Sequence, residues 1–190
     1  MDKNRLESFS DGVLAIIITI MVLQLGIPKG SEITALYPII PILLGYVLSF
    51  IYVGIYWNNH HHLLKTLHNV SGSILWANLI LLFWISLFPF TTAWMAENYF
   101  ASWPTALYGM VLLMAAISYI FLQKLIIRTE GEKSKLKIAI GHDYKGKITI
   151  ILYSIGICVA LISPHFAQVF YVIVALIWLI PDRRIEKILT

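Results

Sequence analysis

A cluster of polar and charged residues lies at the beginning of the first long apolar stretch. This polar cluster comprises Arg5, Phe9, Ser10, Asp11 and Gly12. It leads into residues 13–25, which are interrupted only by Thr19 and Gln24. An unpaired carboxylate in hydrocarbon costs several kcal/mol, so Asp11 must have a partner or a function there. It could bind a cation, or it could accept hydrogen bonds from neighbouring helices.

A run of histidines forms a second candidate site. His60, His61 and His62 are consecutive, and His68 follows shortly after them. Three consecutive residues on a helix point about 100° apart, so at most one or two of them could share a set of metal ligands. No intramembrane carboxylate is spaced to join them. We therefore expect a hydrogen-bonded cluster at the membrane interface, with no metal and no cofactor. A His-ligated metal or haem membrane protein is the less favoured alternative.

The elements that position these residues are membrane helices. Of the 190 residues, 59% are hydrophobic and 13% are charged, whereas a soluble domain carries roughly a quarter charged residues. Six apolar stretches predict six transmembrane helices, and the last two form a tight hairpin. They are Val13–Ile27, Leu36–Tyr56, Ile74–Trp94, Ala106–Ile127, Ile148–Ser163 and Phe166–Ile180. The predicted fold is an all-α integral membrane protein with a single domain, residues 1–190.

The distribution of basic residues predicts the orientation of these helices. With six spans, both termini lie on one side, and that side also receives nearly all of the lysines and arginines. They are Lys3, Arg5, Lys65, Lys124, Arg128, Lys133, Lys135, Lys137, Lys145, Lys147, Arg183, Arg184 and Lys187. The other side receives only Lys29. Because cytoplasmic loops are enriched in Lys and Arg, both termini are predicted to be cytoplasmic in a multi-pass plasma-membrane protein.

The basic charge of the chain is thus explained by topology, and we expect the lipid bilayer as a partner and no nucleic acid. The one stretch of soluble character, residues 128–147, is predicted to be a cytoplasmic loop. Its apolar residues Leu136, Ile138 and Ile140 interrupt the charges and indicate a short amphipathic piece.

The first helix has two apolar faces. Ile16, Ile20 and Leu23 fall within about 60° of one another, and Thr19 lies roughly 60° to one side. Leu14, Ile18 and Met21 occupy the opposite face. Periodicity alone does not decide which of the two faces packs against the protein.

Helical phase nevertheless separates Asp11 from the Ile16 face. Asp11 projects roughly 140° away from that face, whereas Arg5 and Phe9 fall close to it. If Ile16, Ile20 and Leu23 line an axis, Asp11 must point back into its own subunit. The end of the second span and the beginning of the third lie at the same depth, so we expect imidazole or amide donors there to satisfy the carboxylate. The candidate donors are His60, His61 and Asn78.

The run Arg5-x-x-x-Phe9-Ser10-Asp11-Gly12 resembles the signature of the bacterial and archaeal potassium channels related to the lysosomal potassium channel of animals. The resemblance covers the whole chain in topology and the first two dozen residues in motif. It implies a homotetramer whose four first helices surround a pore, with a hydrophobic constriction at Ile16, Ile20 and Leu23. It also implies that Thr19 contributes to ion selectivity. Arg5, Ser10 and Asp11 are implied to hold the first helix against the second and third helices.

The chain contains no Thr-Val-Gly-Tyr-Gly filter, so a ring of isoleucines that gates by dewetting is the expected device for a potassium-permeable channel of modest selectivity. A secondary ion transporter is the main alternative. That class places ionisable residues or unwound helices near the bilayer midplane, and the sequence shows neither. A membrane-embedded enzyme is disfavoured because no nucleophile and base pair occurs at one depth.

Overall fold

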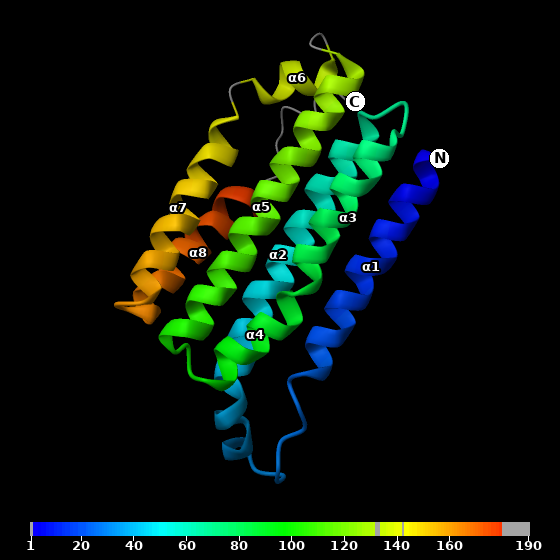
Figure 1. Cartoon of the computed structure of the whole chain (residues 1–190). Helices are drawn as coiled ribbons and strands as arrows, with labels where there is room; N and C mark the ends of the chain where they lie inside the picture. Colours follow the sequence, from blue (N-terminus) through cyan, green and yellow to red (C-terminus); the bar gives the residue numbers. More distant parts are fainter. Residues whose placement is uncertain (1, 132–133, 142, 180–190) are drawn as a thin grey trace.

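The computed structural model describes residues 2–131, 134–141 and 143–179, and every regular element in them is a helix. The elements follow one another along an elongated bundle (Figure 1). They are α1 (Lys3–Leu23), the 3₁₀ helix η1 (Ile33–Ile39), α2 (Ile40–Lys65), α3 (Gly72–Ser86), α4 (Phe88–Glu97), α5 (Ser102–Glu130), α6 (Lys135–Ile140), α7 (Tyr144–Ala160) and α8 (Pro164–Leu179). Lys133, Ile180, Arg183, Arg184 and Lys187, which entered the predicted topology, lie outside the described residues, and the side chain of Lys135 is likewise not described.

Four helical stretches among the described residues are long and apolar enough to cross a membrane: α1, η1 with α2, α3 with α4, and α5. They coincide with the first four predicted spans. The predicted hairpin forms as α7 and α8, with 17 and 16 residues. The prediction of an all-helical membrane protein is thereby confirmed, whereas the count of six spans and their orientation stay predictions.

Proline and capping residues set the boundaries of the helices. The third span divides into α3 and α4 at Leu87, two residues before Pro89, because the proline ring removes a donor and displaces the preceding turn. The Asp2 side chain caps α1 by accepting a hydrogen bond from the Asn4 N–H at 3.2 Å. Aspartate suits this position because its side-chain oxygen accepts from a free N–H group of the first turn.

The core of the bundle is rich in tyrosine. Tyr52, Tyr108, Tyr153 and Tyr171 are fully buried between α2, α5, α7 and α8. The Tyr171 hydroxyl donates to the Thr105 carbonyl at 3.2 Å, and the Tyr108 hydroxyl is 2.9 Å from Ser49 Oγ. These bonds matter because a hydroxyl group without a partner is costly in an apolar interior.

Glycine permits the close approach of α8 to α5 and α7. A methyl group at Gly109 would overlap the Tyr171 hydroxyl, and one at Gly156 would lie 2.7 Å from Cε1 of the same ring. Small residues at such crossings are the usual means of bringing membrane helices together. The α5–α7–α8 side of the bundle is therefore packed around one aromatic ring.

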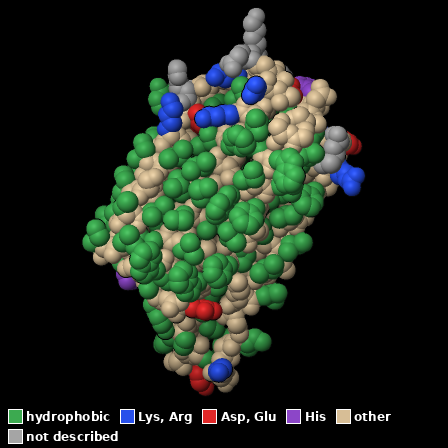
Figure 2. All heavy atoms as spheres, in the orientation of Figure 1, with side chains coloured by type: hydrophobic (Ala, Val, Ile, Leu, Met, Phe, Trp, Pro, Cys, Tyr) green, Lys and Arg blue, Asp and Glu red, His purple; other side chains and the backbone are tan. Residues whose placement is uncertain are grey.

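The surface separates apolar and basic regions along the bundle axis. Hydrophobic side chains cover the middle of the visible face, and Lys and Arg gather at the end where the N-terminus and α6 lie (Figure 2). An apolar band of this kind is what lipid tails contact in a membrane protein. We refer to the end with the N-terminus and α6 as the basic end.

Candidate functional site: the two faces of α1

Ser10 joins α1 to the rest of the bundle. Its hydroxyl is buried, donates to the Leu6 carbonyl at 2.9 Å and accepts from Asn78 Nδ2 at 3.0 Å. Asn78 Oδ1 is 2.6 Å from His60 Nε2. Because an amide oxygen only accepts, His60 carries its proton on Nε2 in this arrangement. A buried hydrogen-bonded chain thus runs from α1 through α3 to α2.

Asp11 makes a separate contact with α2. The indole Nε1 of Trp57 donates to Asp11 Oδ1 at 3.0 Å. The Trp57 ring stacks on the His61 ring, with centroids 6.5 Å apart and an angle of 19° between the planes. The carboxylate therefore points back to its own chain, but its partner is an indole group and not the imidazole or amide group that we expected.

Trp57 was not named from the sequence as a candidate partner of Asp11. It stands one helical turn before His61, at the start of the polar run that ends α2, so it lies on the same face of that helix. An indole N–H at the membrane interface needs a polar partner. That requirement was the signal that could have paired it with Asp11.

Arg5 and Phe9 lie outside this hydrogen-bonded chain. Both are exposed, and both border a cavity of about 360 Å³ between α1 and α3. The cavity is lined by Arg5, Leu6, Phe9, Leu75, Asn78 and Leu79. Gly12 is also exposed, and a methyl group there would meet nothing within 4 Å. The structure therefore brings Ser10, Asn78 and His60 into one chain and leaves Arg5, Phe9 and Gly12 on the outer side of α1.

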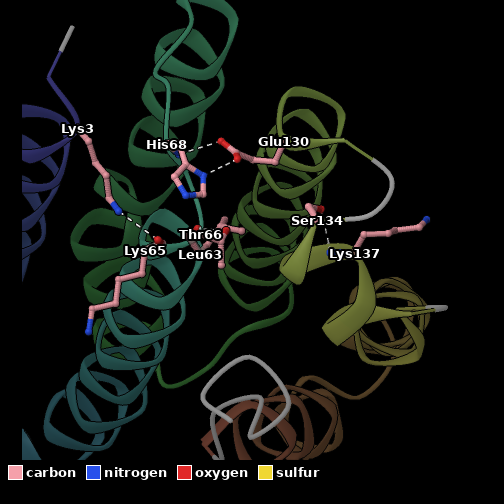
Figure 3. A network of polar contacts seen from close by, with 8 residues as sticks. All are labelled: Lys3, Leu63, Lys65, Thr66, His68, Glu130, Ser134 and Lys137. Carbon is pink, nitrogen blue, oxygen red and sulfur yellow. Dashed lines mark hydrogen bonds and ion pairs between the residues drawn. The ribbon is translucent and has the colours of Figure 1, made fainter. Parts of the chain in front are cut away.

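Further polar contacts tie the helix ends together at the basic end (Figure 3). The Lys3 ammonium donates to the Lys65 carbonyl at 3.1 Å, which links the start of α1 to the end of α2. Glu130, the last residue of α5, accepts from the His68 N–H at 2.8 Å and lies 2.6 Å from its Nδ1. These contacts fix the connection between α2 and α3 against α5.

The outer face of α1 is apolar, and the described part of the chain leaves it exposed. Ile16, Ile20 and Leu23 are 60%, 43% and 76% exposed, whereas Leu14, Ile17 and Met21 are at most 3% exposed. Thr19 is exposed beside them, and its hydroxyl donates to the Ala15 carbonyl at 2.6 Å. The structure thus decides what periodicity left open: the Leu14 side packs inward, and the Ile16 side faces out.

Neither face of α1 is built to hold a metal. Within residues 2–131, 134–141 and 143–179, no group of three or more His, Cys, Asp and Glu side chains is arranged to bind one. His60 is engaged with Asn78, and His61 is stacked on Trp57. The described histidines of the cluster therefore take part in contacts between protein groups.

The fold and these two faces define a multi-pass helical membrane protein whose first helix presents an apolar outer surface. The family model of the endosomal/lysosomal potassium channel TMEM175 matches residues 5–89. A protein of Chryseobacterium sp. (strain P1-3) named a potassium channel is 60% identical over 187 residues, which cover 98% of this chain and 97% of that protein. The chain belongs to the TMEM175 family of ion channels, and it is not an enzyme.

Two further relatives extend the comparison. The crystal structure of a lysosomal potassium-selective channel TMEM175 homologue from Chamaesiphon minutus superposes with a TM-score of 0.83 at 25% identity, covering 95% of this chain and 97% of that one. The endosomal/lysosomal proton channel TMEM175 of Danio rerio is 25% identical over 194 residues, which cover 94% of this chain and 36% of that protein. The chain therefore corresponds to about a third of the fish protein.

Proposed function

We propose that the chain forms a homotetrameric potassium-permeable channel in which four copies of α1 surround the pore. The exposed face of Ile16, Ile20 and Leu23 carries this proposal. In a membrane helix whose opposite face packs into its own bundle, that face must meet lipid, another copy or a pore. The membership of an ion-channel family favours the pore.

The proposed constriction consists of rings of Ile16, Ile20 and Leu23. An apolar neck offers a partly dehydrated cation nothing to replace its lost water, so it closes by dewetting and opens when it widens or becomes hydrated. The chain contains no Thr-Val-Gly-Tyr-Gly sequence. The apolar neck and Thr19 therefore determine the selectivity for potassium, which is modest. Ser10, Asp11, Asn78 and His60 hold α1 at the rotation that directs the apolar face to the axis, together with Trp57.

The proposed topology has six spans, both termini in the cytoplasm and residues 128–147 in a cytoplasmic loop of a single domain. The gathering of Lys and Arg at one end of the described bundle supports this orientation (Figure 2). A plasma-membrane location and the absence of a cofactor belong to the same proposal. In this arrangement Asp11, His60, His61 and His62 lie at the cytoplasmic entrance, outside the narrow part of the pore.

Ion flux in liposomes tests the proposal. A reconstituted channel gives passive flux along a potassium gradient with graded permeability to Rb⁺, Cs⁺ and Na⁺. Strictly coupled, saturating transport would instead indicate a secondary transporter and contradict it.

A variant pair tests the constriction itself. Ile16→Ser is expected to raise resting flux several-fold, because a hydroxyl hydrates the neck, whereas Val22→Ser serves as the control. Val22 is 42% exposed but lies on another side of α1. Equal effects of the two substitutions, or none from either, would remove Ile16 from the neck.

A further inference from the structure

Two exposed apolar surfaces border α1, which lies at one edge of the bundle and packs against both α2 and α3 (Figure 1). Residues three, four or seven positions apart share one side of a helix. Such residues form the α2 flank, which comprises Leu43, Val47, Phe50 and Trp57, and the α3 flank, which comprises Trp76, Leu79, Ile80 and Phe83; all of them are exposed. Tyr52 and Leu81, on the other sides of these two helices, are buried.

The two flanks lie on opposite sides of the outer face of α1. Ser10 and Asp11 project roughly 120° and 140° from Ile16, in opposite directions around the helix. Ser10 bonds to Asn78 of α3. Asp11 bonds to Trp57 of α2. A copy whose Ile16 side faces a pore axis, as in the proposed function, therefore presents its α2 flank to one neighbour and its α3 flank to the other.

Each flank carries two large aromatic side chains at similar depths in the membrane. Trp57 and Phe50 are seven residues apart on α2, and Trp76 and Phe83 are seven residues apart on α3. Both pairs are therefore separated by about 10 Å along the helix. The two tryptophans lie nearer the basic end: Trp57 bonds to α1 itself, and Trp76 stands two residues before the α3 residue that bonds to the adjacent position of α1. The aromatic rings of one flank thus match those of the other in spacing and in level.

Charged groups of α1 also differ between the two sides. The exposed Asp11 lies beside Trp57, on the side of the α2 flank. The exposed Arg5 borders the cavity of about 360 Å³ between α1 and α3, on the side of the α3 flank. Opposite charges favour contact between unlike flanks and disfavour contact between like flanks. A neighbour on the α3 flank would also cover this cavity and supply contacts that its apolar lining lacks.

We propose that the α2 flank of one copy binds the α3 flank of the next copy, with Phe50 at the level of Phe83 and Trp57 at the level of Trp76. This inference rests on the proposed function and names the surfaces that hold its ring of subunits together. Contact between two different surfaces is head-to-tail, so it repeats from copy to copy and can close into a ring around the Ile16 side of α1. Van der Waals packing of the matched aromatic side chains stabilises the contact within the membrane.

Disulfide cross-linking of the full chain in lipid vesicles tests this contact. In a chain with Cys158→Ser, the pair Phe50→Cys and Phe83→Cys is oxidised and then separated by denaturing electrophoresis without reductant. We expect bands of two, three and four linked chains that return to a single chain on reduction, because a disulfide forms only between side chains that lie side by side. Absence of these bands would overturn the proposal and leave the two flanks to lipid.

The matched control pairs Phe50→Cys with Ile117→Cys, because Ile117 is exposed near the middle of α5 but belongs to neither flank. Each cysteine alone is a second control, since a head-to-tail contact does not place a flank residue beside its own copy. Equal linking of the control pair, or linking of Phe50→Cys by itself, would overturn the proposal. Potassium flux through vesicles of the Cys158→Ser parent is measured separately. Its absence while the linked bands persist would contradict the proposed function and not this interface.

Discussion

The two sides of the bundle are held together by different means. On the α5–α7–α8 side, the Tyr171 ring lies against glycines so closely that no methyl group fits at Gly109 or Gly156. On the α1 side, two separate polar contacts, Ser10 with Asn78 and Asp11 with Trp57, join the helix to its neighbours. Close packing of side chains sets the separation between neighbouring helices. Polar contacts at one end of a helix instead set its rotation about its own axis. The outer face of α1 is left exposed.

Asn78→Ala is expected to produce the largest change, because it removes the residue that connects α1 to α2. Ser10 and His60 would both lose a buried partner, and an unsatisfied buried group costs about 1–3 kcal/mol. We expect the free energy of unfolding in mixed micelles to fall by about 3 kcal/mol. Asn98→Ala, which removes only a local bond to the Trp94 carbonyl at an exposed site, is the control and should have a small effect. A small effect of Asn78→Ala would show that the polar chain does not hold α1.

Gly109→Ala tests the opposite side of the comparison. The added methyl group meets the Tyr171 hydroxyl, so α8 must move away from α5, and overpacking of this kind costs about 1–3 kcal/mol. Gly54→Ala on α2 is a matched control, because a methyl group there would meet nothing within 4 Å. The same unfolding measurement should show a loss for Gly109→Ala and little change for Gly54→Ala. Equal stability of the two variants would contradict close packing on this side.

Trp57→Phe sharpens the view that polar contacts fix rotation. It keeps an aromatic ring and removes the donor to Asp11, so the expected loss of stability is only about 1 kcal/mol. The orientation of α1 is the more informative measurement. With Cys158, the only cysteine, replaced by Ser, a cysteine at position 16 reports the exposure of the outer face through its rate of thiol modification. An unchanged rate in Trp57→Phe would mean that Ser10 alone sets the rotation.

Glu130→Gln is expected to have the smallest effect. It keeps a side-chain oxygen for the His68 N–H but removes the carboxylate that faces the imidazole. The His68 side chain is largely exposed to solvent, so the expected loss of stability is about 0.5 kcal/mol. Raising the salt concentration should reduce the difference between the variant and the parent chain. A loss as large as that of Asn78→Ala would place this contact among the main supports of the bundle.

The sequence predicted those features that depend on a single helix. The spacing of Ile16, Ile20 and Leu23 placed them on one face of the first helix, and the structure leaves that face exposed. The sequence did not predict which individual side chains meet between helices. Trp57 became the partner of Asp11 only because α2 lies beside α1 at that depth, and nothing in the spacing of Gly109, Gly156 and Tyr171 shows that they touch. Such contacts join residues up to 62 positions apart, beyond the range of helical periodicity.

The hydrogen bond from Thr19 to Ala15 fixes the orientation of the Thr19 hydroxyl group on the outer face of α1. Its hydroxyl hydrogen is directed to a carbonyl of its own helix at 2.6 Å, so the oxygen presents lone pairs, and no proton, to the exterior. In a tetramer of the proposed kind, the four Thr19 oxygens would form a ring of lone pairs around the axis. Such a ring would attract cations and repel anions. In each subunit the hydroxyl group would already have this orientation before the four copies assemble.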